Sequence, residues 1–270
     1  MAAPNAAHLE LLLFRDSNDA NPYKIFMLNQ NHRSGDYWHI EVEGLSIGCC
    51  YCYKVFEESS SKQHNTYSSK VLLDPCARDI KGWEVYEREL AVGSLDNVHS
   101  CLKAVVSERK SFNFYKHPRP QHKWHETIIY ELHLGGFTRG TGLNIDADKK
   151  GTFLGLIQKI PYIKELGITT IELLPIFSFD PSDSPYGLKN YWGYSPINWF
   201  TPHREYITKT SSLSARDQVR NLIAACHDEG LEVIVDVVYN HTTEGNKDGP
   251  TISWRGFAES TYYHQNSKGE

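Results

Sequence analysis

The sequence of 270 residues lacks several features that would assign it to a common class of protein. It has no basic block, because Lys and Arg total 28 against 33 Asp and Glu, a formal net charge of −5. Nucleic-acid-binding proteins carry a basic patch, so nucleic acid is not an expected partner. No apolar run reaches the roughly 18 residues of a membrane span. The N-terminus also lacks the cationic start of a secretory signal, so no membrane partner is expected.

The six cysteines lack the spacing of a metal site. Cys49, Cys50 and Cys52 lie close together in one strand-like segment, and no second cluster or His pair follows at zinc-finger spacing. We therefore expect free and mostly buried thiols, with no metal and no cofactor. Free thiols and the missing signal predict a cytoplasmic protein, with a plastid as the alternative. The sequence shows no clear plastid transit peptide.

The first part of the chain has the pattern of an all-β domain. Short strand-like runs are predicted over residues 8–14, 37–43 and 50–56, and polar turn clusters separate them. No convincing helix interrupts them, which favours an immunoglobulin-like β-sandwich. We assign this sandwich to residues 1–115 and a linker rich in Lys, His and Pro to residues 116–126.

After the linker the pattern changes to alternating strands and helices. Strands are predicted over 127–134, 168–175 and 231–239. An amphipathic helix is predicted over 151–166, broken or kinked at Pro161, and another over 215–229. The third strand is a nearly continuous apolar run, which predicts a parallel strand covered on both faces. Successive crossovers of this kind are right-handed.

Two parallel architectures fit this alternation, an open doubly wound sheet and a β/α barrel. Gly135-Gly-Phe-Thr-Arg139, after the first of these strands, does not match a glycine-rich phosphate loop. The unusual side chains instead follow the carboxyl ends of the strands, among them His133 and the segment from Asp236 to His241. In a barrel that face carries the chemistry. We therefore assign residues 127–270 to the first part of a (β/α)8 barrel, about three strands, so the chain is predicted to be multi-domain.

Several motifs carry a family resemblance. Asp236-Val-Val-Tyr-Asn-His241 is similar to the first conserved block of the α-amylase superfamily, glycoside hydrolase family 13. Glu172-Leu-Leu-Pro175 and Asn190-Tyr-Trp-Gly-Tyr-Ser-Pro196 resemble further segments of that family. Upstream, residues 35–78 resemble the β-sandwich of carbohydrate-binding module family 48. Together with Tyr130–Arg139 and Gly151–Gly155 these motifs narrow the resemblance to isoamylase-type debranching enzymes.

The resemblance implies hydrolysis of α-1,6-glucosidic branch linkages with retention at the anomeric carbon. Its partner would be a branched α-glucan such as glycogen, amylopectin or limit dextrin. Retention needs two carboxyl groups roughly 5–5.5 Å apart. The resemblance implies that these two groups and a third carboxylate lie on the fourth, fifth and seventh barrel strands. No segment of this chain resembles those blocks. We therefore expect a fragment that contains no catalytic residue, is inactive alone, and begins late in its β-sandwich.

The resemblance also implies three substrate-binding residues. Tyr194 matches a tyrosine that stacks beneath the sugar at the cleavage point, His241 a histidine that hydrogen-bonds that sugar, and Asp236 an aspartate that shapes the same site. Asn240 matches a calcium ligand of many α-amylases, but one amide falls far short of a calcium site, so no metal is assigned. Glu131 and Glu172 lie before the strand ends.

We expect Glu131 and Glu172 to be paired structurally rather than to act as a catalytic pair. Tyr191 and Trp192 are expected to be packing residues. Trp38, Tyr51 and Tyr53 are expected in the core of the sandwich.

Two alternatives of other kinds remain open at this point. The chain could belong to a glucan-binding or regulatory homologue without hydrolytic activity. It could also belong to a sister enzyme of the superfamily, such as a branching enzyme or a trehalohydrolase. The sequence leaves the oligomeric state and the preferred glucan chain length open.

Overall fold

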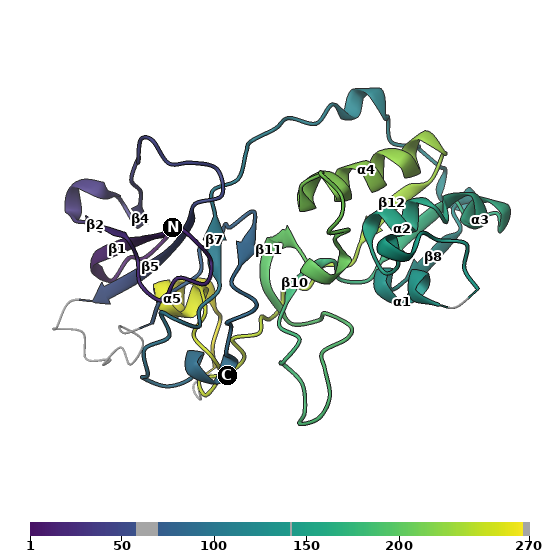
Figure 1. The fold of residues 1–270 in the computed structure, drawn as a ribbon. Helices are drawn as coiled ribbons and strands as arrows, with labels where there is room; N and C mark the ends of the chain where they lie inside the picture. The colour runs from purple at the N-terminus through teal and green to yellow at the C-terminus, as the bar shows by residue number, and fades with distance from the viewer. Residues whose placement is uncertain (58–69, 141, 267–270) are drawn as a thin grey trace. The chain divides into compact units, whose positions relative to one another are not determined.

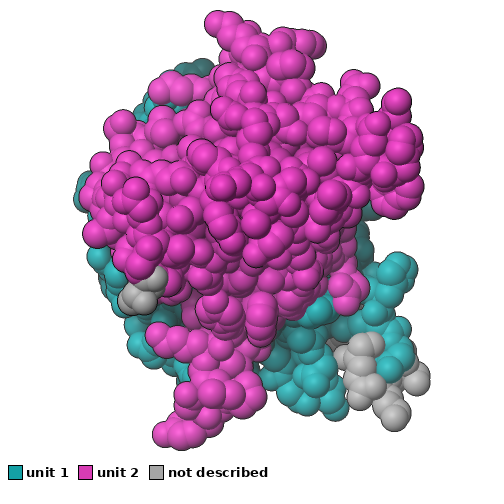
Figure 2. All heavy atoms as spheres, turned by 90° about the vertical axis from the view of Figure 1, so that its right-hand side faces the viewer, with its two compact units in different colours: residues 1–108, 241–270 teal, residues 109–240 magenta. Residues whose placement is uncertain are grey.

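A computed structural model describes residues 1–57, 70–140 and 142–266 (Figure 1). Its contacts divide the chain into two compact units, Met1–Glu108 with His241–Glu270 and Arg109–Asn240 (Figure 2). The residues after Asn240 thus group with the first unit, whereas the predicted boundaries placed them with the barrel. The domain boundaries themselves stay a prediction. In the described residues, no helix is both long enough and apolar enough to cross a membrane.

The first unit is built on a five-stranded antiparallel sheet of order β2-β1-β5-β7-β6. Its strands are β1 (Ala6–Phe14), β2 (Lys24–Leu28), β5 (Cys50–Glu57), β6 (Ile80–Lys81) and β7 (Lys103–Val105). Alternation along β1 directs Leu9, Leu11 and Leu13 to one face, where all three are buried. The strands predicted over 8–14 and 50–56 are confirmed by β1 and β5.

A second layer covers that face of the sheet. It contains the ribbon of β3 (Arg33–Ser34) and β4 (Tyr37–Trp38), and α5 (Trp254–Tyr262) also packs there. Trp38 is 1% exposed and its indole donates to Ala3 O at 2.9 Å. The antiparallel two-layer fold that the sequence predicts is therefore present. The strand predicted over 37–43 is wrong beyond Trp38, because residues 39–43 form no ladder with another strand.

The second unit is built on a parallel sheet of order β12-β9-β8. Its strands are β8 (Ile129–Leu132), β9 (Thr170–Leu173) and β12 (Glu232–Val235). Glu131, Glu172 and Ile234 lie side by side in this register. The sheet is accompanied by the helices α1 (Leu134–Arg139), α2 (Phe153–Ile157), α3 (Ile160–Glu165) and α4 (Ala215–Asp228). This is the opening portion of a β/α barrel, as predicted.

The helices α2, α3 and α4 form where the apolar pattern predicts them, whereas α1 was not predicted. The predicted break near Pro161 is confirmed, since α2 ends at Ile157 and α3 begins at Ile160. Proline lies in the first turn of α3, where its missing N–H costs no hydrogen bond. Ser214 caps α4 by accepting from Asp217 N. Phe153 and Leu222 are fully buried against the sheet, so the helix-covered face forms the core of this unit.

The other face of the parallel sheet is open. Ile129 is 42% and Ile234 39% exposed, although both lie within strands. The expectation that the third strand is covered on both faces is therefore wrong. Three strands cannot close a barrel, so their interior face has no opposing strands among the described residues.

The predicted linker lies against the second unit rather than hanging free. His117 Nδ1 and Asp228 are 2.8 Å apart, and His122 hydrogen-bonds to Gly230 O at 2.8 Å. Arg119 pairs with Glu232 at 3.3 Å. This segment is extended chain with two short turns, η3 (Phe114–Lys116) and η4 (Trp124–Glu126). It passes the C-terminal end of α4 and leads into β8 (Figure 1).

Between β9 and α4 the chain forms an antiparallel pair, β10 (Phe177–Phe179) and β11 (Pro196–Pro202). The long loop that joins them carries most of the aromatic motif named above (Figure 1). Because β10 follows β9 closely, this pair starts at the carboxyl end of the parallel sheet.

Candidate functional site

The carboxyl ends of the three parallel strands place three residues in one layer. His133 follows β8, Leu174 follows β9 and Asp236 follows β12. Leu174 N donates to Leu132 O at 3.1 Å, and Asp236 N donates to Leu173 O at 2.9 Å. The backbone ladder therefore continues one residue past the strands. This fixes the backbone of Asp236 at the end of the sheet where a β/α barrel binds its substrate.

Tyr194 and Asp236 are directly bonded. The Tyr194 hydroxyl donates to Asp236 Oδ2 at 2.5 Å. Partial burial, then the bond to Asp236, and then the charges of Glu131 and Glu172 raise the pKa of Tyr194 to about 12. The phenol therefore stays protonated near neutrality and remains a donor. The ring is 38% exposed, so it offers a surface as well as a bond.

Gly193 makes the position of Tyr194 possible. Its φ of +81° lies in the left-handed region that favours glycine. A Cβ built there would lie 2.8 Å from Cδ1 of Phe179. Its N–H donates to Asn190 Oδ1 at 3.1 Å, which closes the turn. The backbone of this loop can therefore approach β10 only because no side chain is present.

His133 lies in an aromatic cage beside this layer. Tyr191 stacks on its ring at 4.1 Å, while Trp192 and Tyr206 meet it edge-on, each at 5.8 Å. His133 Nδ1 accepts from Gly136 N at 2.9 Å, so Nε2 carries the proton and donates to Tyr191 O at 2.9 Å. Burial lowers the pKa of His133, which favours this neutral form.

The packing role predicted for Tyr191 and Trp192 agrees with these ring contacts. Both side chains also keep about half of their surface exposed, 45% and 55%. They thus hold the loop on His133 with one face and leave the other face accessible. The strand-end position of His133 was visible in the sequence, but its contacts with a loop some 60 residues away were not.

Glu131 and Glu172 do not pair structurally as expected. They are neighbours on the open face of β8 and β9. Within the described ranges neither side chain forms an ion pair or a hydrogen bond. Their charges act instead on the Tyr194 hydroxyl, whose ionisation they oppose.

Of the three predicted substrate-binding residues, the structure brings two together. Tyr194 and Asp236 belong to the second unit, whereas His241 is the first residue of the segment grouped with the first unit. The binding roles of all three stay predictions. Trp199 is a supporting residue that the motifs did not reveal. Its indole donates to Val238 O at 2.8 Å and braces the chain just after Asp236.

The described residues hold no cluster of three or more His, Cys, Asp or Glu side chains suited to a metal ion. The groups at the strand ends are a short-bonded Tyr–Asp pair, a neutral imidazole and exposed aromatic faces. Aromatic faces and fixed hydrogen-bonding groups suit a neutral, hydroxyl-rich ring better than a phosphate, which the nearby carboxylates would repel.

Two family models match the chain. The model described as "Alpha amylase, catalytic domain" matches residues 136–268. The model described as "Carbohydrate-binding module 48 (Isoamylase N-terminal domain)" matches residues 3–77.

Curated relatives match over almost the whole chain. A glycogen operon protein GlgX homolog of Haemophilus influenzae is 34% identical, covering 98% of this chain and 39% of its own length. A glycogen debranching enzyme of Cronobacter sakazakii is 35% identical over 96% of this chain and 40% of its own. The chain thus spans about two fifths of the length of these relatives.

Solved structures agree in fold. The pullulanase from Bacillus acidopullulyticus matches with a TM-score of 0.73 at 22% identity, over 100% of this chain and 31% of its own. The Group B Streptococcus pullulanase SAP in complex with maltotetraose matches with a TM-score of 0.74 at 24% identity, over 100% and 34%. At these identities the likeness shows the fold alone.

Proposed function

This chain belongs to the α-amylase family of glycoside hydrolases, with a family 48 carbohydrate-binding module ahead of its catalytic domain, and from this premise we propose that the whole protein is a debranching enzyme. It hydrolyses α-1,6-glucosidic branch linkages of glycogen or a related α-glucan with retention at the anomeric carbon. The relatives named above support debranching rather than branching or trehalose release.

The observation that carries the proposal is the bond between Tyr194 and Asp236 at the carboxyl end of β12. The carboxylate holds the phenol hydroxyl, so the ring cannot turn freely. A fixed ring can stack against the C–H face of a pyranose without a charge of its own. The second oxygen of Asp236 remains available to accept from sugar hydroxyls. This chain would thus supply one wall of the pocket for the glucose at the cleavage point.

The reacting carboxyl groups would come from residues outside this chain. Retaining hydrolysis needs a nucleophile and an acid–base roughly 5–5.5 Å apart. Glu131 and Glu172 are not proposed as this pair, because both lie within strands, below the strand-end layer that holds Asp236. The proposed role of this chain is to bind and orient glucose, while bond cleavage depends on the remainder of the protein.

A reducing-end assay on amylopectin tests the proposal. The 270-residue chain alone should release no reducing ends, whereas a protein extended to the length of its relatives should release linear chains. Tyr194→Phe and Asp236→Ala in the extended protein should each lower kcat/KM. Release by the short chain that disappears in Glu131→Gln or Glu172→Gln would contradict the assignment. An extended protein that transfers chains without releasing reducing ends would make it a branching enzyme.

The proposed location is the cytoplasm, as the free thiols support. All six cysteines are unpaired, and four of them are buried. A reducing compartment keeps such thiols free. Cell fractionation with an antibody against the protein would test this, and recovery from an extracellular or plastid fraction would contradict it.

A further inference from the structure

Two buried cysteines of the first unit face each other across a short gap. Cys52 lies in β5 and Cys101 precedes β7, and their sulfur atoms are 4.0 Å apart. Cys52 is 0% and Cys101 4% exposed. Both are free thiols. A disulfide needs the sulfurs about 2 Å closer.

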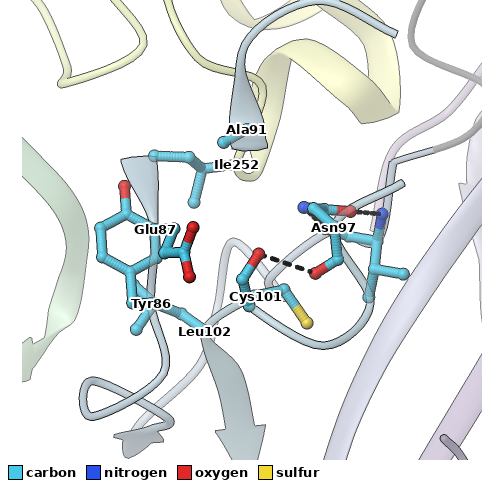
Figure 3. Close-up of a pocket in the computed structure, with 9 residues that line it drawn as sticks. Tyr86, Glu87, Ala91, Asn97, Cys101, Leu102 and Ile252 are labelled. Atoms are coloured by element: carbon cyan, nitrogen blue, oxygen red, sulfur yellow. Dashed lines mark hydrogen bonds between the residues drawn. The ribbon is translucent and has the colours of Figure 1, made fainter. Parts of the chain in front are cut away.

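One of the two cysteines, Cys101, helps to line a pocket. It is lined by Val71, Tyr86, Glu87, Ala91, Asn97, Ser100, Cys101, Leu102 and Ile252 (Figure 3). Its volume is about 10 Å³, which is room for about one molecule of the size of water. Glu87 on its rim is exposed and Tyr86 is half-buried, so the pocket leads from the surface toward Cys101. Cys52 is not among the lining residues and lies behind Cys101.

The pocket is held open by polar contacts that do not involve the thiols. Asn97 is buried, accepts from Val71 N at 2.7 Å and donates to Val71 O at 3.1 Å (Figure 3). Ser100 donates to Asn97 O at 3.4 Å. The turn that carries Cys101 is therefore tied to the extended segment that contains Val71.

We propose that Cys101 and Cys52 form an oxidation site that takes a small peroxide, with Cys101 as the reacting thiol and Cys52 as the resolving thiol. Cys101 sulfur attacks one peroxide oxygen, the O–O bond breaks, and hydroxide leaves and takes up the thiol proton as water. Cys52 sulfur then attacks the sulfenic acid on Cys101, forms the S–S bond and releases a second water. Two thiols and one hydrogen peroxide thus give one disulfide and two waters.

The surroundings assign the two roles in this order. The hydrogen bond with Cys52, helped by the nearby Lys103, lowers the pKa of Cys101 against the opposing effect of its burial, whereas burial raises the pKa of Cys52. Lys103 is itself buried, with its ammonium group 2.8 Å from Ser17 O. The thiol beside the pocket is therefore also the one more easily ionised, as a peroxide-reactive cysteine requires.

The test is peptide mapping of the purified 270-residue chain after treatment with hydrogen peroxide. Free thiols are alkylated, and tandem mass spectrometry locates any bond within the peptide that carries Cys49, Cys50 and Cys52. The expected product is a Cys52–Cys101 disulfide that forms at least tenfold faster than oxidation of Cys226 and reverts with a thiol reductant. Cys226 is the matched control, because it is equally buried and lies in the other unit.

Variants separate the two roles. In Cys52→Ser, Cys101 should be trapped as a sulfenic acid by dimedone, whereas in Cys101→Ser, Cys52 should remain a free thiol. In a denaturant the preference for this pair should vanish, which ties it to the fold. Recovery of both cysteines as free thiols at a peroxide dose that oxidises the exposed Cys76 would overturn the proposal. A bond from Cys101 to Cys49 or Cys50 at equal yield would overturn it too.

Discussion

Tyr194 and Asp236 are joined by a 2.5 Å hydrogen bond although 42 residues separate them in the sequence. One lies in the loop before β11 and the other directly after β12. The bond thus connects the aromatic loop to the end of the parallel sheet, and it places a sugar-sized ring surface at that end.

The first prediction concerns the strength of this bond. A double-mutant cycle of Tyr194→Phe and Asp236→Asn should give a coupling free energy of about 0.5–1 kcal/mol in urea unfolding. The value is modest because the pair is partly exposed. Tyr191→Phe with Asp236→Asn is the control pair and should show no coupling. Additive effects in the first cycle would mean that the bond does not form.

The Tyr194 hydroxyl should ionise at a higher pH than an ordinary tyrosine. Its folded pKa is raised to about 12, above the unfolded value of 10.0. Its contribution to stability is therefore present below pH 10 and is lost as pH rises from 10 to 12. A difference ultraviolet titration of the wild type against Tyr194→Phe should show one phenol that ionises near pH 12. If the phenol that the Tyr194→Phe variant lacks ionises near pH 10 in the wild type, the hydrogen bond to Asp236 does not form.

Gly193 should be far less tolerant of alanine than Gly187. Both glycines have a φ of +81°. A Cβ at Gly193 meets Phe179 at 2.8 Å, whereas one at Gly187 has nothing within 4 Å. Gly187→Ala should cost about 1 kcal/mol from backbone strain alone. Gly193→Ala should cost about 1–3 kcal/mol more, since overpacking is added. Equal losses in thermal unfolding would show that the contact with Phe179 is unimportant.

His203 should make the second unit sensitive to acid. It is 1% exposed and stacks on Phe179 at 3.7 Å. Burial lowers its pKa to about 3, below the unfolded value of 6.5. The unfolded chain therefore binds a proton that the folded chain refuses, and stability falls as pH drops below 6.5. The loss should reach about 2 kcal/mol at pH 5 relative to pH 7.

A non-titrating variant isolates that contribution. His203→Gln should be less stable at pH 7 but should lose about one proton's worth of pH dependence between pH 7 and pH 5. His125→Gln, on an exposed histidine, is the control and should keep the wild-type slope. An unchanged slope in His203→Gln would assign the acid sensitivity to another group.

Glu244 should be the carboxylate on which the C-terminal part of the first unit most depends. It is fully buried and accepts from the backbone N–H groups of Ile252, Ser253 and Arg255. It also accepts from the Tyr263 hydroxyl at 2.5 Å. In Glu244→Gln the side-chain amide NH2 would face these N–H and O–H donors without an acceptor between them. The variant should therefore lose about 2–4 kcal/mol of unfolding free energy.

The matched change for that prediction is Glu89→Gln, on an exposed glutamate of the same unit. It should alter the free energy of unfolding by less than about 0.5 kcal/mol. Urea unfolding followed by tryptophan fluorescence measures both variants. If the two variants have the same free energy of unfolding, the carboxylate of Glu244 does not contribute to the stability of this unit.

The sequence predicted the elements whose pattern is local. The stripe of α4, the break before α3 and the strands β1 and β5 all follow from periodicity and from Pro161. The strand over 37–43 failed because a strand also needs a neighbour, and residues 39–43 have none. The prediction that the third parallel strand is covered on both faces was wrong for a similar reason, as the exposure of Ile234 shows. An apolar run shows which side chains can be buried, but not whether another element covers them.

In the candidate site, too, the sequence predicted the features that depend on a local motif and missed those that depend on distant contacts. Tyr194 and Asp236 were found by their motifs, because each motif fixes a residue type at a fixed place in the fold. Gly193 lies within one of those motifs, but its requirement became visible only when Phe179 was placed beside it. The aromatic cage around His133 combines a strand end with a distant loop, and no short pattern records such a contact.

Glu131 and Glu172 impose a condition on any polypeptide that completes this partial barrel. They put two negative charges side by side on its inner wall, just below Asp236. Enclosing three acids away from solvent is costly unless cations or hydrogen-bond donors come with the enclosure. We therefore expect the wall opposite to bring cations or hydrogen-bond donors toward these carboxylates.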